Sequence, residues 1–357
     1  MRGINRLFVL TAFLATLLPG AEKPQFTVGW SVYVGYTPIY YMAKQGLLKK
    51  WGDKYGVSIK AQRFDYGASL DAFVAKNIDA CLMTNMEALD MPAAAGIDTS
   101  AIIIDDYSNG NDAVLTRNGL KLKDLPGKSV LLVEKTISQY LFERAMAING
   151  LASQINRVRI VNTSDSDIAG AFLADTSQTA VVTWKPMVSQ IKRAPGITSV
   201  FDSSQLPGEI MDITVVRTDL LNRPDGAGQR FAKALVGAWY ETMALMLGHG
   251  PAADRALAGV AAGSQDTLES YKEQVATTRF LGTPQMALQI ADAPDFKQKM
   301  KLVSQFCHGH GLVGGGHGGS AEDVAIRYSD GQVEGNPNHV RLRFDTSYIR
   351  LASEGRL

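Results

Sequence analysis

The sequence predicts an α/β protein of two lobes, each built around a largely parallel sheet, with two crossover strands that form a hinge between them. Three observations predict this fold class. The chain has 357 residues, which is enough for two separate hydrophobic cores. Strand-like and helix-like patterns alternate along most of its length. The alternation breaks at the polar, glycine-containing residues 105–112 and then resumes.

The first residues, 1–21, predict a secretory signal peptide. Arg2 and Arg6 precede an apolar run over residues 7–18. This run is too short to cross a bilayer, because a membrane span needs about 20 apolar residues. We expect cleavage after Ala21 and therefore a periplasmic location. A buried N-terminal helix is the alternative.

Residues 25–110 predict the first part of lobe 1. Strand-like runs lie at residues 26–30, 57–64, 80–83 and 100–104. Helices are expected between them over residues 38–45, 69–76 and 86–95. In the first helix, Thr37 is the expected N-cap, Pro38 takes the first position and Gly46 ends it. The β-α order predicts parallel strands with right-handed crossovers and helices on both faces.

Residues 111–212 predict lobe 2. Its expected strands lie at residues 129–133, 157–161 and 180–183. Its expected helices cover residues 137–149 and 168–173, with another that begins at Pro186. The two extended crossovers between the lobes are expected near residues 105–117 and 210–217.

Residues 213–357 predict the second part of lobe 1. The strand at residues 212–217 returns to that lobe, and a mostly helical stretch follows to about residue 311. Apolar and polar residues alternate over 340–344, which predicts a strand in an ordered C-terminal cap or tail. A two-lobed enzyme of the same build fits this pattern too.

Charge and cysteine content narrow the function classes. The chain has 36 basic and 35 acidic residues, so it carries no overall field that would attract nucleic acid or an anionic membrane. Its two cysteines are Cys81 and Cys307. Because Cys81 lies in an apolar run, two buried thiols are expected, with a disulfide as the alternative.

No catalytic or cofactor motif is present. The chain has no phosphate-binding loop, no G-x-S-x-G elbow and no H-E-x-x-H motif. His308, His310 and His317 fit no zinc-ligand spacing, so solvated loop histidines are expected and no metal site is predicted. The sequence therefore predicts neither an enzyme nor a cofactor.

The candidate ligand-binding residues follow the predicted strands, because open α/β sheets bind ligands beyond the carboxyl ends of their strands. The ten selected positions are Trp30, Tyr33, Thr84, Asn85, Glu87, Asp106, Asp112, Glu134, Trp184 and Asp212. They are rich in carboxylates and rings and contain no arginine, which favours a small, flat, cationic or donor-rich ligand. An anion remains the alternative, because Lys185 and the helix start near Ile137 could bind one.

Three segments carry a family resemblance: VGWSVYVG at residues 28–35, MTNMEAL at 83–89 and DDYSNGND at 105–112. The chain resembles substrate-binding proteins of ABC importers of the nitrate, sulfonate and taurine type. Within them it is most similar to the subgroup associated with urea carboxylase, which is assigned urea or guanidine. The resemblance extends to FDTSY at residues 344–348.

The resemblance implies a periplasmic-binding-protein-like fold of type II and a monomer. It also implies that the hinge closes around one small ligand and that the closed form docks on a membrane permease. An alkylsulfonate, nitrate or a thiamine-precursor pyrimidine is the alternative ligand. A pyrimidine-synthesising enzyme of related fold is a further alternative, although the cysteine-rich motif of that enzyme has no counterpart here.

Guanidinium fits the candidate residues better than urea does. Guanidinium is a flat cation with N–H donors only, so carboxylates such as Glu87 and Asp112 at its edge and a ring such as Trp30 at its face would satisfy it. Urea also needs a hydrogen-bond donor to its carbonyl oxygen, such as Asn85. Because buried carboxylates without a matching cation are costly, guanidinium is favoured.

Overall fold

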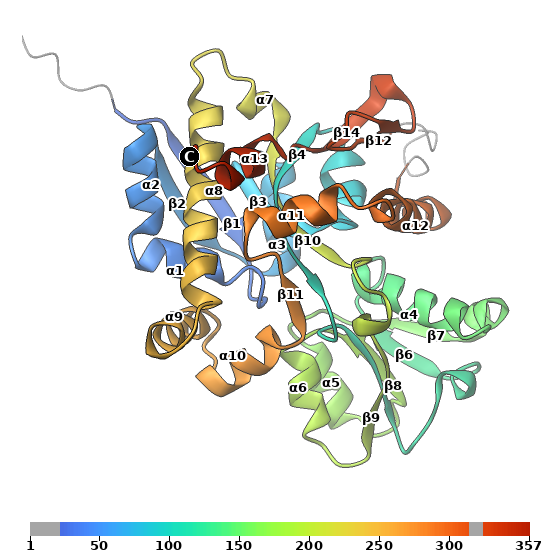
Figure 1. The fold of residues 1–357 in the computed structure, drawn as a ribbon. Coiled ribbons are helices and arrows are strands. Elements are labelled where there is room, and N and C mark those ends of the chain that lie inside the picture. Colours follow the sequence, from blue (N-terminus) through green and yellow to red (C-terminus); the bar gives the residue numbers. More distant parts are fainter. Residues whose placement is uncertain (1–21, 314–323) are drawn as a thin grey trace, which may run out of the picture.

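The computed structural model describes residues 22–313 and 324–357. It has a larger lobe, which holds both chain ends of the described part, and a smaller lobe drawn in green (Figure 1). The predicted signal peptide, its cleavage site and His317 lie outside the described residues.

A nine-stranded sheet forms the larger lobe. Its strands are β1 (Gln25–Trp30), β2 (Ser58–Arg63), β3 (Ala80–Thr84), β4 (Thr99–Ser108), β10 (Met211–Arg217), β11 (Thr278–Phe280), β12 (Ala325–Arg327), β13 (Val333–Glu334) and β14 (Val340–Phe344). Eight of them follow the order β13-β12-β14-β4-β10-β3-β1-β2, and β11 pairs with β4.

The larger sheet is mixed rather than parallel throughout. β1 pairs in parallel with both β2 and β3, as predicted. β10, however, lies antiparallel between β3 and β4. The chain enters β10 on its way back from the smaller lobe, so this strand runs opposite to the first four.

The smaller lobe contains a five-stranded sheet of order β7-β6-β8-β5-β9. Its strands are β5 (Ala113–Arg117), β6 (Ser129–Leu132), β7 (Arg159–Asn162), β8 (Ala180–Thr183) and β9 (Ile197–Asp202). Its helices are α4 (Ile137–Ile148), α5 (Ile168–Ala174) and α6 (Met187–Lys192). β6 is parallel to β7 and β8, whereas β5 is antiparallel to β8 and β9.

Two connections join the lobes, from β4 to β5 and from β9 to β10, and they are bonded to each other. The Ser203 hydroxyl in the second connection lies 2.6 Å from the Ser108 hydroxyl at the end of β4. Ser203 Oγ also accepts a hydrogen bond from the backbone N–H of Gly110 in the first connection, at 2.8 Å. The two connections therefore lie side by side where the chain passes between the lobes.

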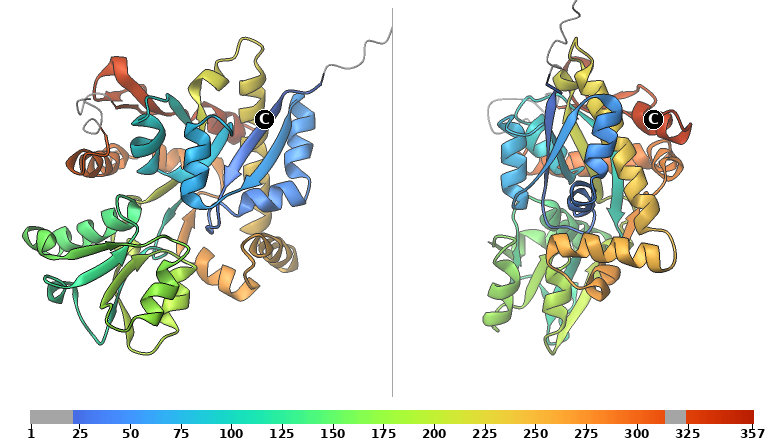
Figure 2. Two further views of the ribbon diagram at one scale, coloured as in Figure 1. Left: turned by 180° about the vertical axis from the view of Figure 1, so that it is seen from behind. Right: turned by 90° about the vertical axis from the view of Figure 1, so that its left-hand side faces the viewer.

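The remaining helices cover both faces of the larger sheet (Figure 2). They are α1 (Pro38–Lys44), α2 (Leu47–Tyr55), α3 (Tyr66–Val74), α7 (Thr218–Leu221), α8 (Ala227–Met246), α9 (Pro251–Ala261), α10 (Leu268–Val275), α11 (Pro284–Ala291), α12 (Phe296–Gly309) and α13 (Ser347–Ser353). No helix among residues 22–313 and 324–357 is long and apolar enough to span a membrane.

Two predicted helices differ from the structure. The helix that begins at Pro38 ends at Lys44, and a second helix, α2, starts directly after Gly46, whose φ is 72°. Thr37 does not cap α1, because its hydroxyl donates to the Tyr33 carbonyl oxygen at 2.7 Å instead. The helix expected over 86–95 is a π-helical turn at Leu89–Ala93 that includes Pro92, which has no N–H to donate.

The C-terminal strand was predicted as part of a cap or tail, and this interpretation was wrong. β14 lies inside the larger sheet, where it is parallel to β4 on one side and to β12 on the other. The apolar residues of its alternating pattern are buried against the core of the larger lobe.

The histidines of α12 are not solvated loop residues either. His308 lies within the helix and His310 at its C-cap, and both are half-buried. His310 Nε2 lies 2.9 Å from Glu143 Oε1 of α4, so this pair joins the larger lobe to the smaller one. The cysteine prediction is confirmed, since Cys81 and Cys307 are both free and buried.

Two glycine substitutions, one in α8 and a control in α5, test how closely α8 packs on α2. A Cβ at Gly237 of α8 would collide with the Trp51 ring of α2, 2.7 Å from its Cδ2 atom, whereas a Cβ at Gly170 of α5 would meet nothing. We expect Gly237→Ala to lower the free energy of unfolding by about 1–3 kcal/mol. Gly170→Ala should raise it by up to about 1 kcal/mol, because alanine favours the helix. Urea unfolding measures both, and equal effects would contradict the packing.

Candidate functional site

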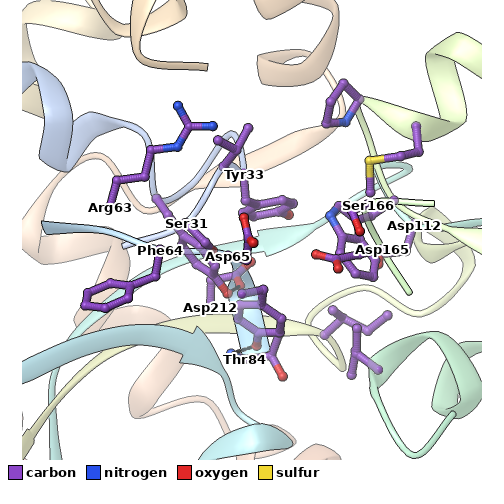
Figure 3. A pocket seen from close by; sticks show the side chains of 18 residues that line it. Ser31, Tyr33, Arg63, Phe64, Asp65, Thr84, Asp112, Asp165, Ser166 and Asp212 are labelled. Carbon is purple, nitrogen blue, oxygen red and sulfur yellow. Dashed lines mark hydrogen bonds between the residues drawn. The ribbon is translucent and has the colours of Figure 1, made fainter. Parts of the chain in front are cut away.

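A cavity with a volume of about 180 Å³ lies between the lobes (Figure 3). The larger lobe lines it with residues that follow β1, β2 and β3 and with the start of β10. The smaller lobe contributes the first residue of α4 and the loops after β7 and β8. The cavity therefore lies at the carboxyl ends of the parallel strands, where such sheets bind ligands.

Half of the predicted ligand-binding residues line this cavity. They are Tyr33, Thr84, Asp112, Trp184 and Asp212. Asp106 and Glu87 lie buried directly behind them, and each contacts a cavity residue, as described below.

The other three predicted residues lie elsewhere. Asn85 donates its side-chain amide to the carbonyl oxygen of Glu209 at 3.0 Å and so holds the second connection. Trp30 lines a separate cavity of the larger lobe, beneath the guanidinium group of Arg63, which lies 6.0 Å from its ring centre. Glu134 is exposed and outside the cavity.

A row of polar side chains crosses the floor of the cavity on three neighbouring strands. Asp212 of β10 is paired in register with Thr84 of β3 on one side and with Asp106 of β4 on the other. The carboxyls of Asp106 and Asp212 thus lie next to each other, so ionisation of one opposes ionisation of the other. Asp212 also accepts a hydrogen bond from the Tyr36 hydroxyl.

The backbone at Gly35 packs directly against this row of side chains. A side chain at Gly35 would collide with the Asp106 carboxylate, so glycine is the residue that fits there. Burial raises the pKa of Asp106 and of Asp212 well above the usual range, and neighbouring carboxylates raise both further. Both oxygens of Asp106 and one of Asp212 lack a hydrogen-bond donor among the described residues.

Asp112, in the first connection, adds a further carboxylate to the cavity wall. It accepts a hydrogen bond from the Ser108 hydroxyl at 2.5 Å. Burial raises the pKa of Asp112 to about 7, and the nearby Glu87 carboxyl also raises it. Within the described part of the chain, no salt bridge involves Asp106, Asp112, Asp212 or Glu87. The cavity thus holds several acidic groups that form no salt bridge with a described basic residue.

Four aromatic rings form one wall of the cavity. The ring centres of Tyr33 and Tyr36 are 4.9 Å apart, those of Tyr36 and Tyr66 6.1 Å, and those of Tyr66 and Trp184 6.4 Å. The last pair spans the two lobes, because Tyr66 follows β2 and Trp184 follows β8. Ring faces next to carboxylates attract cations.

Several lining residues were not among the ten predicted positions. Tyr36, Tyr66, Asp165 and Met187 all follow strands, so the rule that gave the other positions also covers them. Asp165 lies across the cavity from Arg63 (Figure 3). The sequence offered no signal for Ile137 as a lining side chain, because it belongs to the apolar face of α4.

The groups that could bind an anion are largely occupied. Lys185 Nζ donates to the carbonyl oxygen of Glu273 at 3.0 Å and to Thr277 Oγ1 at 2.9 Å. The backbone N–H of Ile137, at the start of α4, donates to Glu87 Oε1 at 3.2 Å. Arg63 is the basic side chain that lines the cavity; it is exposed, and its guanidinium group lies apart from Asp112 and Asp165 (Figure 3).

Comparisons with known proteins give matches among solved structures alone. No protein-family model matches the chain, and no curated protein matches it. The alkanesulfonate-binding protein SsuA from Xanthomonas axonopodis pv. citri, bound to MOPS, is 16% identical with a TM-score of 0.65, over 82% of this chain and 96% of that one.

Two further structures give similar values. The periplasmic aliphatic sulphonate binding protein SsuA from Escherichia coli is 15% identical with a TM-score of 0.65, over 81% of this chain and 88% of that one. A DszB mutant in complex with biphenyl-2-sulfinic acid is 16% identical with a TM-score of 0.54, over 82% and 93%.

These likenesses define the fold class. The protein has the two-lobed α/β fold of periplasmic binding proteins, as the sequence predicted. Two of these neighbours are sulfonate-binding proteins, and at 15–16% identity their likeness shows a shared fold.

Proposed function

We infer that the protein is the extracytoplasmic solute-binding protein of an ABC importer and that its ligand is a small planar cation of the guanidinium class. The lobes close around the ligand at a hinge formed by the two connections, and the closed form delivers it to a membrane permease. The protein acts in the periplasm as a monomer, after removal of residues 1–21. It needs no cofactor and performs no catalysis.

The observation that carries this proposal is the charge of the cavity. Asp112 and Asp212 line it, Asp106 and Glu87 lie directly behind, and the described residues provide no salt-bridge partner for any of the four. Buried carboxylates without a cation are costly. A guanidinium ion in the cavity would place a positive charge beside these groups and donate N–H bonds to the lining carboxyls of Asp112 and Asp212, while the tyrosine wall would cover its face.

The size of the cavity agrees with a ligand of a few atoms. A single water molecule needs a cavity volume of only about 10–15 Å³, so a cavity of about 180 Å³ has room for a guanidinium-sized ion together with several water molecules. Urea has the same shape but no charge, and its carbonyl oxygen would face carboxylates. We therefore rank urea below guanidinium.

A sulfonate is the second candidate ligand. Two structural neighbours are sulfonate-binding proteins, and Arg63 lies at the edge of the cavity. The carboxylates argue against this ligand, because an oxyanion would have to bind beside them.

A thermal-shift screen separates the two candidates. Guanidinium chloride at low millimolar concentration, far below the molar range that unfolds proteins, is compared with urea, taurine, methanesulfonate, nitrate and sodium chloride. A ligand present at about 100 times its dissociation constant stabilises the folded state by about 2.7 kcal/mol. We expect stabilisation by guanidinium and none by taurine. Stabilisation by taurine and not by guanidinium would assign the site to an anion.

A further inference from the structure

Glu87 connects the two lobes directly behind the residues that line the ligand cavity. It lies at the end of the loop after β3 in the larger lobe and is fully buried. One carboxyl oxygen accepts a hydrogen bond from the hydroxyl of Thr84, the last residue of β3. The other accepts a hydrogen bond from the backbone N–H of Ile137, the first residue of α4 in the smaller lobe.

The contact uses a position at which proteins commonly bind anions. The first N–H groups of a helix have no partner within the helix, and the helix dipole favours negative charge there. In α4 the next donor is already satisfied, since the Ser138 N–H bonds to the Thr136 hydroxyl at 3.3 Å. The Ile137 N–H is left for an acceptor from outside the helix, and Glu87 supplies that acceptor.

The first turn of α4 also carries a buried hydroxyl group without a hydrogen-bond partner. The Ser138 side chain is completely buried, and its hydroxyl has no hydrogen-bond partner among the described residues. The Ile137 side chain lines the ligand cavity, so this turn borders the cavity. Without Glu87, the Ile137 N–H would have no acceptor at this border.

We propose that Glu87 determines the charge specificity of the site: its carboxyl group, reaching from the larger lobe to the Ile137 N–H of the smaller one, occupies the place where an oxyanion would bind. The closed site therefore admits cations and excludes sulfonates. This inference rests on the proposed function and adds the residue that sets the ligand class. It also makes Glu87 a positioning residue, because the same bond holds the lobes together.

Two substitutions of Glu87 distinguish the effect of its charge from the effect of its oxygen atom at the start of α4. Glu87→Ala removes the carboxyl and frees the Ile137 N–H. Glu87→Gln keeps an oxygen that accepts from that N–H but carries no charge. The probes are sodium methanesulfonate and guanidinium chloride, each measured by thermal shift and calorimetry on the full mature chain.

The expected results differ between the variants. Glu87→Ala should bind methanesulfonate at least about tenfold more tightly than the unmodified protein does, since an oxyanion can then occupy the helix start. Glu87→Gln should gain no methanesulfonate binding and should bind guanidinium about tenfold more weakly. A merely structural role of Glu87 would lower the melting temperature of both variants and create no oxyanion binding.

A third substitution tests the donor itself. Ile137→Pro removes the N–H at the first helical position, where proline is well tolerated, and the extended Thr136 before it is compatible with proline. In the background of Glu87→Ala it should abolish the gained methanesulfonate binding. If Glu87→Ala does not fold, Glu87→Ser serves in its place, because serine is too short to reach Ile137.

The outcomes distinguish this inference from the proposed function. If the unmodified protein binds guanidinium and neither Glu87→Ala nor Glu87→Ser gains methanesulfonate binding, the specificity role of Glu87 is wrong and the proposed function stands. If the unmodified protein itself binds methanesulfonate and not guanidinium, the proposed function is wrong.

Discussion

Replacement of Asp112 by asparagine is expected to weaken guanidinium binding about 100-fold, which corresponds to about 2.7 kcal/mol. The carboxylate lines the cavity, is buried and has no basic partner, so a bound cation would be its counter-ion. Removal of one member of a buried ion pair typically costs about 3–5 kcal/mol. Isothermal titration calorimetry measures the change.

The same substitution should stabilise the empty protein at pH 8. Burial raises the pKa of Asp112 to about 7, so the folded state pays to ionise this group above that pH. Asparagine removes this cost and can still accept a hydrogen bond from Ser108. Because one pKa unit corresponds to about 1.4 kcal/mol, a pKa of about 7 in place of 3.8 predicts a gain in the free energy of unfolding on the order of 4 kcal/mol.

Asp165→Asn is the matched control. Asp165 also lines the cavity, but it lies at the partly exposed rim, so water screens its charge and its loss should weaken binding only about two- to fourfold. Equal losses in both variants would show that general electrostatic attraction, rather than a buried ion pair, drives binding. Unchanged guanidinium affinity in Asp112→Asn would remove Asp112 from the site.

Guanidinium binding should become tighter as the pH rises from about 5 to about 7.5, by up to tenfold per pH unit for each proton released. Guanidinium keeps its charge throughout, because its pKa lies above about 12. Asp112, with a pKa of about 7, is largely protonated at pH 5 in the empty site and must lose its proton to pair with the cation. Burial also raises the pKa of Glu87 and that of Asp212, so both groups contribute to the same pH dependence.

The stability of the empty protein should change in the opposite sense. The pKa of Asp112 is higher in the folded protein than in the unfolded chain, so its favourable contribution to stability is complete below about pH 4 and is lost as the pH rises through about 7. The melting temperature of the empty protein should therefore fall over this window while the shift caused by guanidinium grows.

Calorimetry in buffers of different ionisation enthalpy counts the protons released on binding. We expect close to one proton per guanidinium near pH 6, and a flatter pH profile for Asp112→Asn. An affinity independent of pH would contradict ionisation of the acids on binding. A guanidinium affinity that falls with rising pH would contradict it as well.

The sequence predicts the position of the site better than the roles of its residues. Each strand end is a local feature, so Tyr33, Thr84 and Trp184 were found from apolar runs and the residues that follow them. Strand pairing is not local. The insertion of β10 between β3 and β4, which sets Asp212 beside Asp106, depends on a strand more than 100 residues further along the chain.

Glu87 and Trp30 also have contacts with distant parts of the chain that local sequence patterns do not reveal. The sequence marked Glu87 as a ligand contact, but its second partner is the backbone of Ile137, 50 residues away, which no local pattern reveals. Trp30 ends β1, and the structure places its ring in a cavity that also includes Tyr40 and Gly263. The side of the sheet that a terminal strand residue faces depends on register and packing, not on its own side chain.

The two buried thiols have a practical consequence. Burial raises the pKa of the Cys81 thiol to about 12, and Cys307 is equally enclosed, so neither will react readily with a maleimide. A cysteine introduced at the exposed rim residue Ser166 would then be the single accessible attachment point for a fluorescent dye. Emission from that dye would report lobe movement directly, turning the molecule into an optical sensor for its own ligand.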